Sequence, residues 1–222
     1  MGAEAEKARQ GAIVRDSAMN EAALRALSSE ELAWRSREGC RASFGQLVER
    51  YAPRLLYFLS RRTSGIHDAE DLVQDTLVRA FENVHRYRKT WKFSTWLFTI
   101  AARLATSNYR KKQKAREFSK TSSNDTTCPS TILLRQEERL SLWAQAMELS
   151  ENQYQVLWLK YAEDMSVKEI ARVMGKSQVS VKVLLYRARA GLAQRLQDKL
   201  AEKNSLDEVC PERELHKMKT GV

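Results

Sequence analysis

Apolar residues recur three and four positions apart along most of this chain, a spacing that gathers them on one face of an α-helix. Little interrupts the pattern, since the 222 residues include only eight Gly and three Pro. No segment alternates apolar and polar residues strongly enough to indicate a strand. The sequence therefore predicts an all-α protein, with enough length for one large domain or two small ones.

The helical pattern falls into two blocks, 28–112 and 137–200, separated by a polar segment. Residues 113–136 lack periodicity, contain Pro129 and are rich in Ser and Thr, as linkers are. Residues 1–27 show no convincing core face and are expected to form a mobile extension, and residues 201–222 read as a charged tail. We therefore expect two small helical domains joined by a flexible linker.

A formal net charge of +10 favours a polyanionic partner, with nucleic acid the first candidate. Cys40, Cys128 and Cys210 form no CxxC pair and have no His at metal-ligand spacing, which is typical of reduced thiols in a cytoplasmic protein. No apolar run has the length of a signal-peptide core or a membrane span. The sequence thus predicts no membrane insertion, no metal and no cofactor, and it shows no catalytic residue set, so an enzyme is not expected.

The second block contains a helix-turn-helix pattern. Ser166 and Glu169 have the spacing of a capping box, Gly175 suits the left-handed end of that helix, and Ser177 can cap the next one. The second helix is basic, and its apolar residues, Val181, Leu185, Ala188, Leu192 and Leu196, recur at helical spacing. This is the plan of a DNA-binding motif. The alternative is an ordinary amphipathic hairpin with a solvated basic face.

Charge is segregated in the first block. Residues 68–75 contain four acids and no base, whereas residues 85–116 contain ten Lys or Arg and no acid. An ordinary soluble surface mixes the two signs, so this separation suggests two faces with different partners. For the acidic segment, a solvated helix N-terminus favoured by the helix dipole is the simpler alternative.

Aromatic and basic residues alternate in the segment 86–93. Single-stranded nucleic acid is often held this way, with bases stacked on rings and cations along the backbone. The alternative is that the aromatic residues belong to the core. We favour the core for Trp96, which lies in an apolar run, and leave both readings open for Trp91, which lies in an expected loop.

These segments together resemble the extracytoplasmic-function (ECF) group of bacterial RNA polymerase sigma factors, which keep the second and fourth sigma domains. Residues 68–81, DAEDLVQDTLVRAF, are similar to the helix that docks on the coiled coil of the polymerase clamp. Residues 93–112 are similar to the helix that contacts and opens the promoter −10 element. Residues 149–192 resemble the fourth domain, which binds the −35 element.

The resemblance implies a promoter-specificity subunit that binds core polymerase at the clamp coiled coil and the flap, recognises duplex and melted promoter DNA, and is itself controlled by an anti-sigma factor in many relatives. It implies core-binding positions at Asp68, Glu70, Asp71, Gln74 and Asp75. It implies −10 DNA contacts at Arg88, Lys89, Trp91, Lys92, Arg103, Asn108, Arg110 and Lys111. It implies −35 DNA contacts at Lys176, Ser177, Ser180, Lys182, Leu184, Arg187 and Arg189.

The chain departs from the family pattern in the recognition helix. Val183 and Leu184 stand where a small polar residue and Arg are frequent. They cannot make the usual hydrogen bonds to bases, although apolar side chains can touch a thymine methyl. Ala102-Arg103 replaces an Arg-Asn pair in the −10 helix, and the linker holds only Glu117 and Asp125 where an acidic stretch is common.

Two other functions remain open on the sequence. A conventional helix-turn-helix regulator would explain residues 166–195 but would leave the acidic and aromatic-basic segments without a purpose. A sigma-like adaptor that has lost promoter recognition would explain Val183-Leu184.

Overall fold

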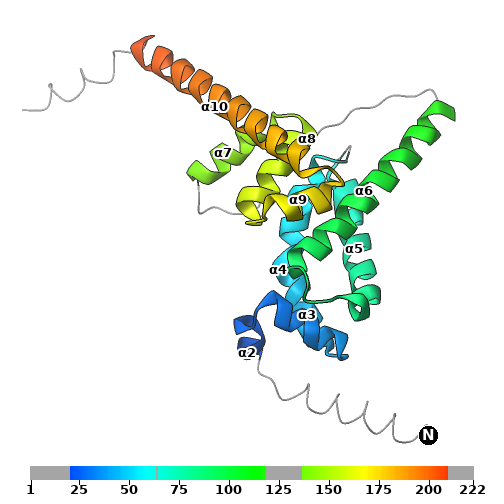
Figure 1. Ribbon diagram of the computed structural model, residues 1–222. Coiled ribbons are helices and arrows are strands. Elements are labelled where there is room, and N and C mark those ends of the chain that lie inside the picture. The colour runs from blue at the N-terminus through cyan, green and yellow to red at the C-terminus, as the bar shows by residue number, and fades with distance from the viewer. Residues whose placement is uncertain (1–20, 64, 119–136, 210–222) are drawn as a thin grey trace, which may run out of the picture.

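The computed structural model describes residues 21–63, 65–118 and 137–209, and all regular elements within these ranges are helical, as predicted (Figure 1). In chain order they are α2 (Glu21–Ala26), α3 (Ser29–Arg37), α4 (Arg41–Ser60), α5 (Ile66–Asn83), the 3-10 turn η1 (Val84–Arg86), α6 (Phe93–Phe118), α7 (Glu137–Met147), α8 (Glu151–Leu157), the π-helical turn η2 (Trp158–Ala162), α9 (Val167–Met174) and α10 (Gln178–Val209).

Helices α2 to α6 form the first domain around α4, which contacts α2, α3, α5 and α6. Helix α4 continues through Pro53 without a break, and its apolar face stays aligned on both sides of the proline. Leu55, Phe58 and Leu59 are completely buried, and Phe58 meets Phe98 of α6 edge to face at 5.1 Å between ring centroids. Contacts of this kind fix α5 and α6 side by side on α4.

Helices α7 to α10 form the second domain, and its helix-turn-helix is confirmed. The Ser166 hydroxyl accepts from the backbone N–H of Glu169, whose carboxylate accepts from the N–H of Ser166, so the predicted capping box begins α9. Gly175 ends α9 with φ 62°, a left-handed conformation that a residue without Cβ adopts at little cost. Ser177 accepts from the N–H of Ser180 at the start of α10.

Three helix boundaries differ from the sequence expectation, one of them at the end of α10, which runs to Val209, nine residues past its expected end at Leu200. Residues 21–26 form α2, with Leu24 buried, although residues 1–27 were expected to be a mobile extension. Only Leu24 and Leu27 face the core there, which is too short a signal to identify a helix. Helix α6 continues to Phe118, six residues past its expected end at Lys112, because Gln, Lys, Ala, Arg and Glu readily extend an existing helix. Residues 1–20, 119–136 and 210–222 lie outside the described residues.

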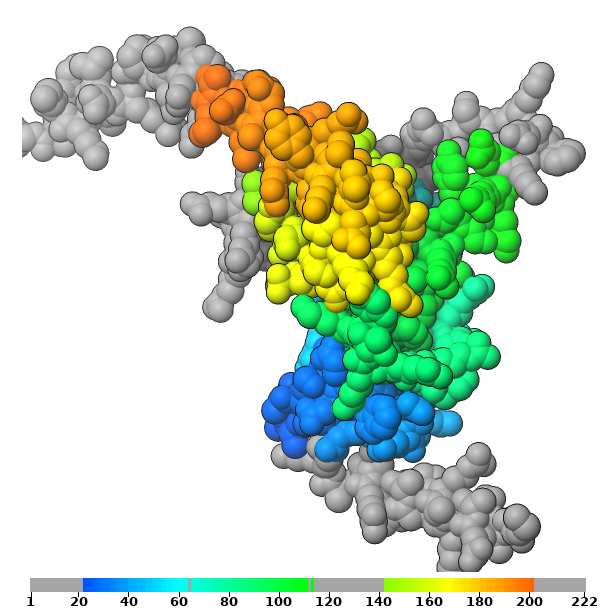
Figure 2. Space-filling model, in the orientation of Figure 1, coloured from blue at the N-terminus to red at the C-terminus, as the bar shows by residue number. Residues whose placement is uncertain are grey.

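The two domains pack against each other. Helix α9 lies on α6, and the buried apolar residues form one cluster that runs from α2 to α10 without a gap. In Figure 2 the second domain, in yellow, sits directly on the green surface of α6. The far half of α10 leaves the body and projects outward (Figure 1). Sequence periodicity predicted both domains but gave no sign of this contact.

Candidate polymerase and DNA interfaces

The acidic segment forms the first half of α5 and lies at the surface. Asp68 is half-buried, and Glu70, Asp71, Gln74 and Asp75 are exposed. Leu72, Val73 and Thr76 of the same helix are buried, which orients the acids outward. The exposed stripe continues with Val78, at 56% exposure. An acidic face with an apolar end can bind a protein surface that combines basic and apolar groups.

The aromatic-basic segment forms η1 and the loop before α6. Tyr87 and Phe93 are buried, and Trp96 packs against the core, which confirms the core reading for Trp96. The Tyr87 hydroxyl donates to the Trp91 carbonyl at 3.0 Å and so fixes the loop. Burial raises the pKa of Tyr87 to about 12, so this donor keeps its proton at neutral pH. The remaining predicted −10 residues of the loop, Arg88, Lys89 and Lys92, are exposed.

The other predicted −10 residues lie along α6. Arg103, Arg110 and Lys111 are exposed, and Asn108 is half-buried. Together with the loop they give the first domain a basic side that carries no acid between positions 85 and 116. The acidic side of α5 and the basic side of α6 therefore belong to one small domain, with the two helices in direct contact.

Trp91 is covered by the second domain. The Arg172 guanidinium lies 4.7 Å and the Lys168 ammonium 5.3 Å from the centre of its ring, both from α9. Next to them, Lys92 donates to the Asp164 carbonyl at 3.3 Å. A base cannot stack on the face of Trp91 that these cations occupy. The loop can use that face of Trp91 only after α9 has moved away.

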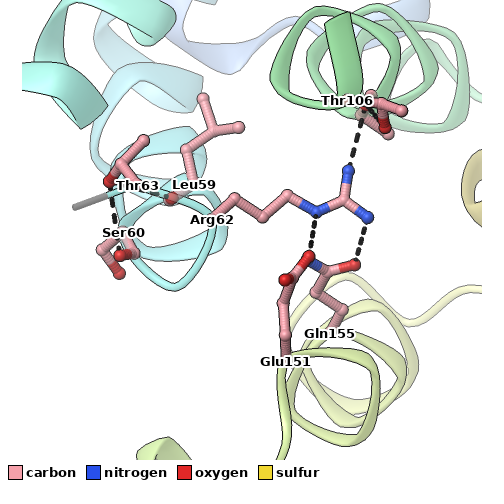
Figure 3. A network of polar contacts seen from close by, with 8 residues as sticks. Leu59, Ser60, Arg62, Thr63, Thr106, Glu151 and Gln155 are labelled. Atoms are coloured by element: carbon pink, nitrogen blue, oxygen red, sulfur yellow. Dashed lines mark hydrogen bonds and ion pairs between the residues drawn. The ribbon is translucent and has the colours of Figure 1, made fainter. Parts of the chain in front are cut away.

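Further contacts between the domains come from the end of α4. Arg62 forms an ion pair with Glu151 at 3.0 Å and donates to the Gln155 side chain at 2.7 Å and to the Ala102 carbonyl at 3.0 Å. Figure 3 shows its guanidinium between α6 and α8, directed at Glu151 and Gln155. Burial lowers the pKa of Arg62, and Glu151 opposes that shift. From the turn after α4, this side chain links α6 of the first domain to α8 of the second.

A second ion pair joins Arg54 of α4 to Glu163, at 2.8 Å. The Glu163 side chain is fully buried, and burial raises its pKa although Arg54 and Trp158 act in the opposite direction. Tyr57 stacks on Trp158 with ring centroids 5.5 Å apart. Sequence reasoning missed Arg54, Arg62 and Glu163, because contacts between residues about 100 positions apart leave no local pattern.

The predicted −35 residues lie at the turn and on α10. Lys176, Lys182 and Arg187 are exposed. Ser177 and Ser180, also exposed, join their hydroxyls at 2.9 Å in the helix cap. Leu184 was expected to face outward, but it is half-buried against the core. Arg189 donates a hydrogen bond to the Tyr161 hydroxyl at 2.7 Å. The cationic surface around the turn matches the requirement for a phosphate backbone.

Glu169 connects the helix-turn-helix to the first domain. It accepts from the Thr95 hydroxyl of α6 at 2.9 Å as well as from Ser166. Burial alone would raise the pKa of Glu169, but the hydrogen bonds from the Ser166 backbone and side chain and from Thr95 outweigh it, and the pKa is lowered. A carboxylate whose pKa is lowered by folding stabilises the fold above its unfolded pKa, and this contribution is lost as the pH falls through the folded pKa.

We therefore expect Glu169→Gln to lower the free energy of unfolding by about 1–2 kcal/mol at pH 7, since Gln keeps the shape of the cap but not its charge. The difference from the wild type should shrink as the pH falls through the lowered pKa of the native Glu169 carboxylate, where that group takes up a proton. Urea unfolding of the variant and the wild type from about pH 3.5 to pH 7 measures this difference in the free energy of unfolding. Glu82→Gln, at an exposed position of α5, is the control. A loss that does not change with pH would contradict the role of the charge.

Comparison with known proteins agrees with this architecture. Residues 47–115 match Sigma-70 region 2, and residues 139–192 match Sigma-70 region 4. The RNA polymerase sigma factor YlaC of Bacillus subtilis is 33% identical over 158 residues, which cover 68% of this chain and 91% of YlaC. The ECF RNA polymerase sigma factor BldN of Streptomyces coelicolor is 29% identical over 173 residues, covering 76% of this chain and 66% of BldN.

Solved structures agree as well. The sigma factor RpoE from Bartonella quintana, determined in complex with the anti-sigma factor NepR, matches with a TM-score of 0.60 and 25% identity, covering 69% of this chain and 96% of RpoE. CnrH, determined with the cytosolic domain of CnrY, matches with a TM-score of 0.52 and 27% identity, covering 75% of this chain and 96% of CnrH.

The paired domains and these matches define a sigma-70-type transcription initiation factor. Within that class, the chain belongs to the ECF group of RNA polymerase sigma factors. It directs RNA polymerase to promoters for transcription initiation. In the described parts of the chain, no helix combines the length and apolarity needed to cross a membrane.

Proposed function

We propose that different surfaces of this sigma factor bind core polymerase and the two promoter elements. The acidic face of α5, formed by Asp68, Glu70, Asp71, Gln74 and Asp75, docks on the clamp coiled coil of core polymerase. The loop 86–92 and the basic side of α6 bind the −10 element. Helices α9 and α10 bind the −35 element, and the second domain also binds the flap of the polymerase. The observation that carries this proposal is the opposite charge of α5 and α6 within one domain, together with the exposed cations at the turn and on the outward side of α10 in the helix-turn-helix.

Promoter melting then follows from binding energy. Bases that protein side chains hold unstacked cannot pair again, so binding shifts the equilibrium from duplex to melted DNA. Trp91 offers an aromatic face for stacking, and Arg88 and Lys89 offer charge for the backbone. The sigma factor needs no catalytic group of its own for this step, since the chemistry of RNA synthesis belongs to the polymerase. We place the protein in the cytoplasm, where polymerase and promoters are.

The packed arrangement of the domains blocks stacking on the face of Trp91 over which Lys168 and Arg172 lie. We therefore propose that the domains separate when the protein joins core polymerase. The 18 residues between Phe118 and Glu137 can span up to about 60 Å when extended, so the chain itself permits the separation.

An anti-sigma factor is a further proposed partner. RpoE and CnrH were each determined in complex with another protein, NepR and the cytosolic domain of CnrY. We call the arrangement in which the two domains contact each other the packed form. A protein that binds the packed form would hold Trp91 under α9 and cover the α5 face.

The −35 contact is tested at Arg187, which is exposed on α10. We expect Arg187→Ala to weaken binding of holoenzyme to promoter DNA and to reduce the slope of log affinity against log salt by up to about one unit, the effect of one lost phosphate contact. Lys199→Ala, which removes an exposed cation farther along the same helix, is the matched control. An unaltered slope would argue against a phosphate contact at Arg187.

A further inference from the structure

The outward side of α10 carries an apolar stripe. Val179 is 72% exposed, Val183 43% and Tyr186 76%. With Ala190 these residues recur at spacings of four, three and four, so they lie along one line of the helix. Exposed apolar residues in a row are unusual on a surface that also has to repel nonspecific protein contacts.

This stripe lies opposite the side by which α10 is anchored. The buried residues of this part of the helix are Val181, Leu185 and Ala188, and each lies two positions from a member of the stripe. Two positions correspond to about 200° around a helix. Val183 therefore projects away from the core, whereas its neighbour Leu184 packs against the core. Of the apolar pair that departs from the family pattern, Val183 is the more exposed and Leu184 is half-buried.

The surroundings of the stripe indicate which partner it meets. Lys182 and Arg187 are exposed on its two sides. From position 170 to 197 the chain contains six Lys or Arg and no acid. Such a surface attracts a polyanion, and the first turns of the second helix of a helix-turn-helix enter the major groove. The packed form leaves this stripe exposed, although it covers Trp91.

We infer that Val179 and Val183 read the −35 element by apolar contact with the C5-methyl groups of thymines, while Lys182 and Arg187 hold the flanking phosphates. The inference rests on the proposed binding of α10 to the −35 element and adds how its sequence is read. Thymine is the only base that presents a methyl group in the major groove, so an aliphatic side chain distinguishes it without a hydrogen bond. Tyr186 lies one turn farther along and extends the apolar contact.

The test removes the methyl groups and nothing else. Holoenzyme selects its promoters from a library, and each thymine of the selected −35 element is then replaced by deoxyuridine, which keeps the same hydrogen-bonding groups. We expect the affinity to fall roughly fourfold at one or two positions, the effect of removing one methyl from an apolar contact. Val183→Ala or Val179→Ala should lower affinity for the thymine template by a similar factor and abolish the further loss on the uracil template at the position contacted.

Leu200→Ala is the matched control, because Leu200 is 61% exposed on the same helix but lies outside the helix-turn-helix. It should leave the uracil penalty unchanged. The inference is overturned if uracil is neutral at every position, if the penalty persists in both valine variants, or if the selected element contains no thymine on either strand. Unchanged promoter affinity of both variants, with loss of binding to a protein partner, would also overturn it and identify the stripe as a protein-docking surface.

Failure of the underlying function gives a different result. If α10 does not bind the −35 element, replacing that whole element leaves affinity unchanged, and so does Arg187→Ala. If α10 binds the element but reads it otherwise, both of these changes weaken binding while the uracil substitutions do not.

Discussion

Asp71→Arg is expected to reduce affinity for core polymerase by about 10- to 100-fold, because it places a cation in the middle of an acidic face that we assign to a basic partner surface. Asp71 is exposed on α5 between Glu70 and Gln74, so the substitution should change the free energy of unfolding by no more than about 0.5 kcal/mol. Titration of labelled protein with core polymerase measures the affinity, and urea unfolding checks the fold.

Glu49→Arg is the matched control for Asp71→Arg, since it makes the same charge change at an exposed position of α4. It should leave core affinity within about threefold of the wild type, because long-range charge effects are screened at physiological salt. Equal affinities of the Asp71 variant and the wild type would remove α5 from the interface. Equal losses in both variants would indicate a general charge effect instead.

Arg62→Ala is expected to weaken the contact between the domains most strongly among single substitutions at that contact. It removes the ion pair with Glu151 and the hydrogen bonds to Gln155 and to the Ala102 carbonyl, and it leaves the buried Gln155 without its charged donor. The expected loss is about 2–4 kcal/mol in the free energy of unfolding; Glu151 is half exposed, which keeps the loss below that of a fully buried pair.

The same substitution should favour separated domains. We expect a larger radius of gyration in solution scattering and tighter binding of a single-stranded −10 oligonucleotide by the free protein, because α9 then leaves the ring of Trp91. Lys199→Ala, exposed on the projecting part of α10, should change neither quantity. A variant that is destabilised but keeps the wild-type radius and oligonucleotide affinity would contradict the link between Arg62 and the covering of Trp91.

The parts of the fold that local chemistry determines could be predicted from the sequence. Ser166, Glu169 and Gly175 specify the start and end of α9 within ten residues, and the structure has both caps as expected. Trp96 was assigned to the core from the apolar run around it, and it packs there. In each case the side chain acts on neighbours that are close in the sequence.

The remainder depends on tertiary contact. Leu184 was expected to face DNA with Val183, yet it stands three positions after Val181 and so shares the buried side of α10. Trp91 could be a stacking platform or a core residue on the sequence, and the structure places it under Lys168 and Arg172, more than 70 positions away. Thr95 and Glu169 likewise meet only because α9 lies on α6.

The most direct test of the account combines the purified protein with core polymerase and a library of promoter templates. We predict a stable complex with core and transcripts that start at a discrete set of promoters sharing −10 and −35 elements, with none from core alone. Failure to bind core would contradict the assignment of α5. A complex that binds core but yields no promoter-dependent transcript would contradict promoter recognition and favour an adaptor.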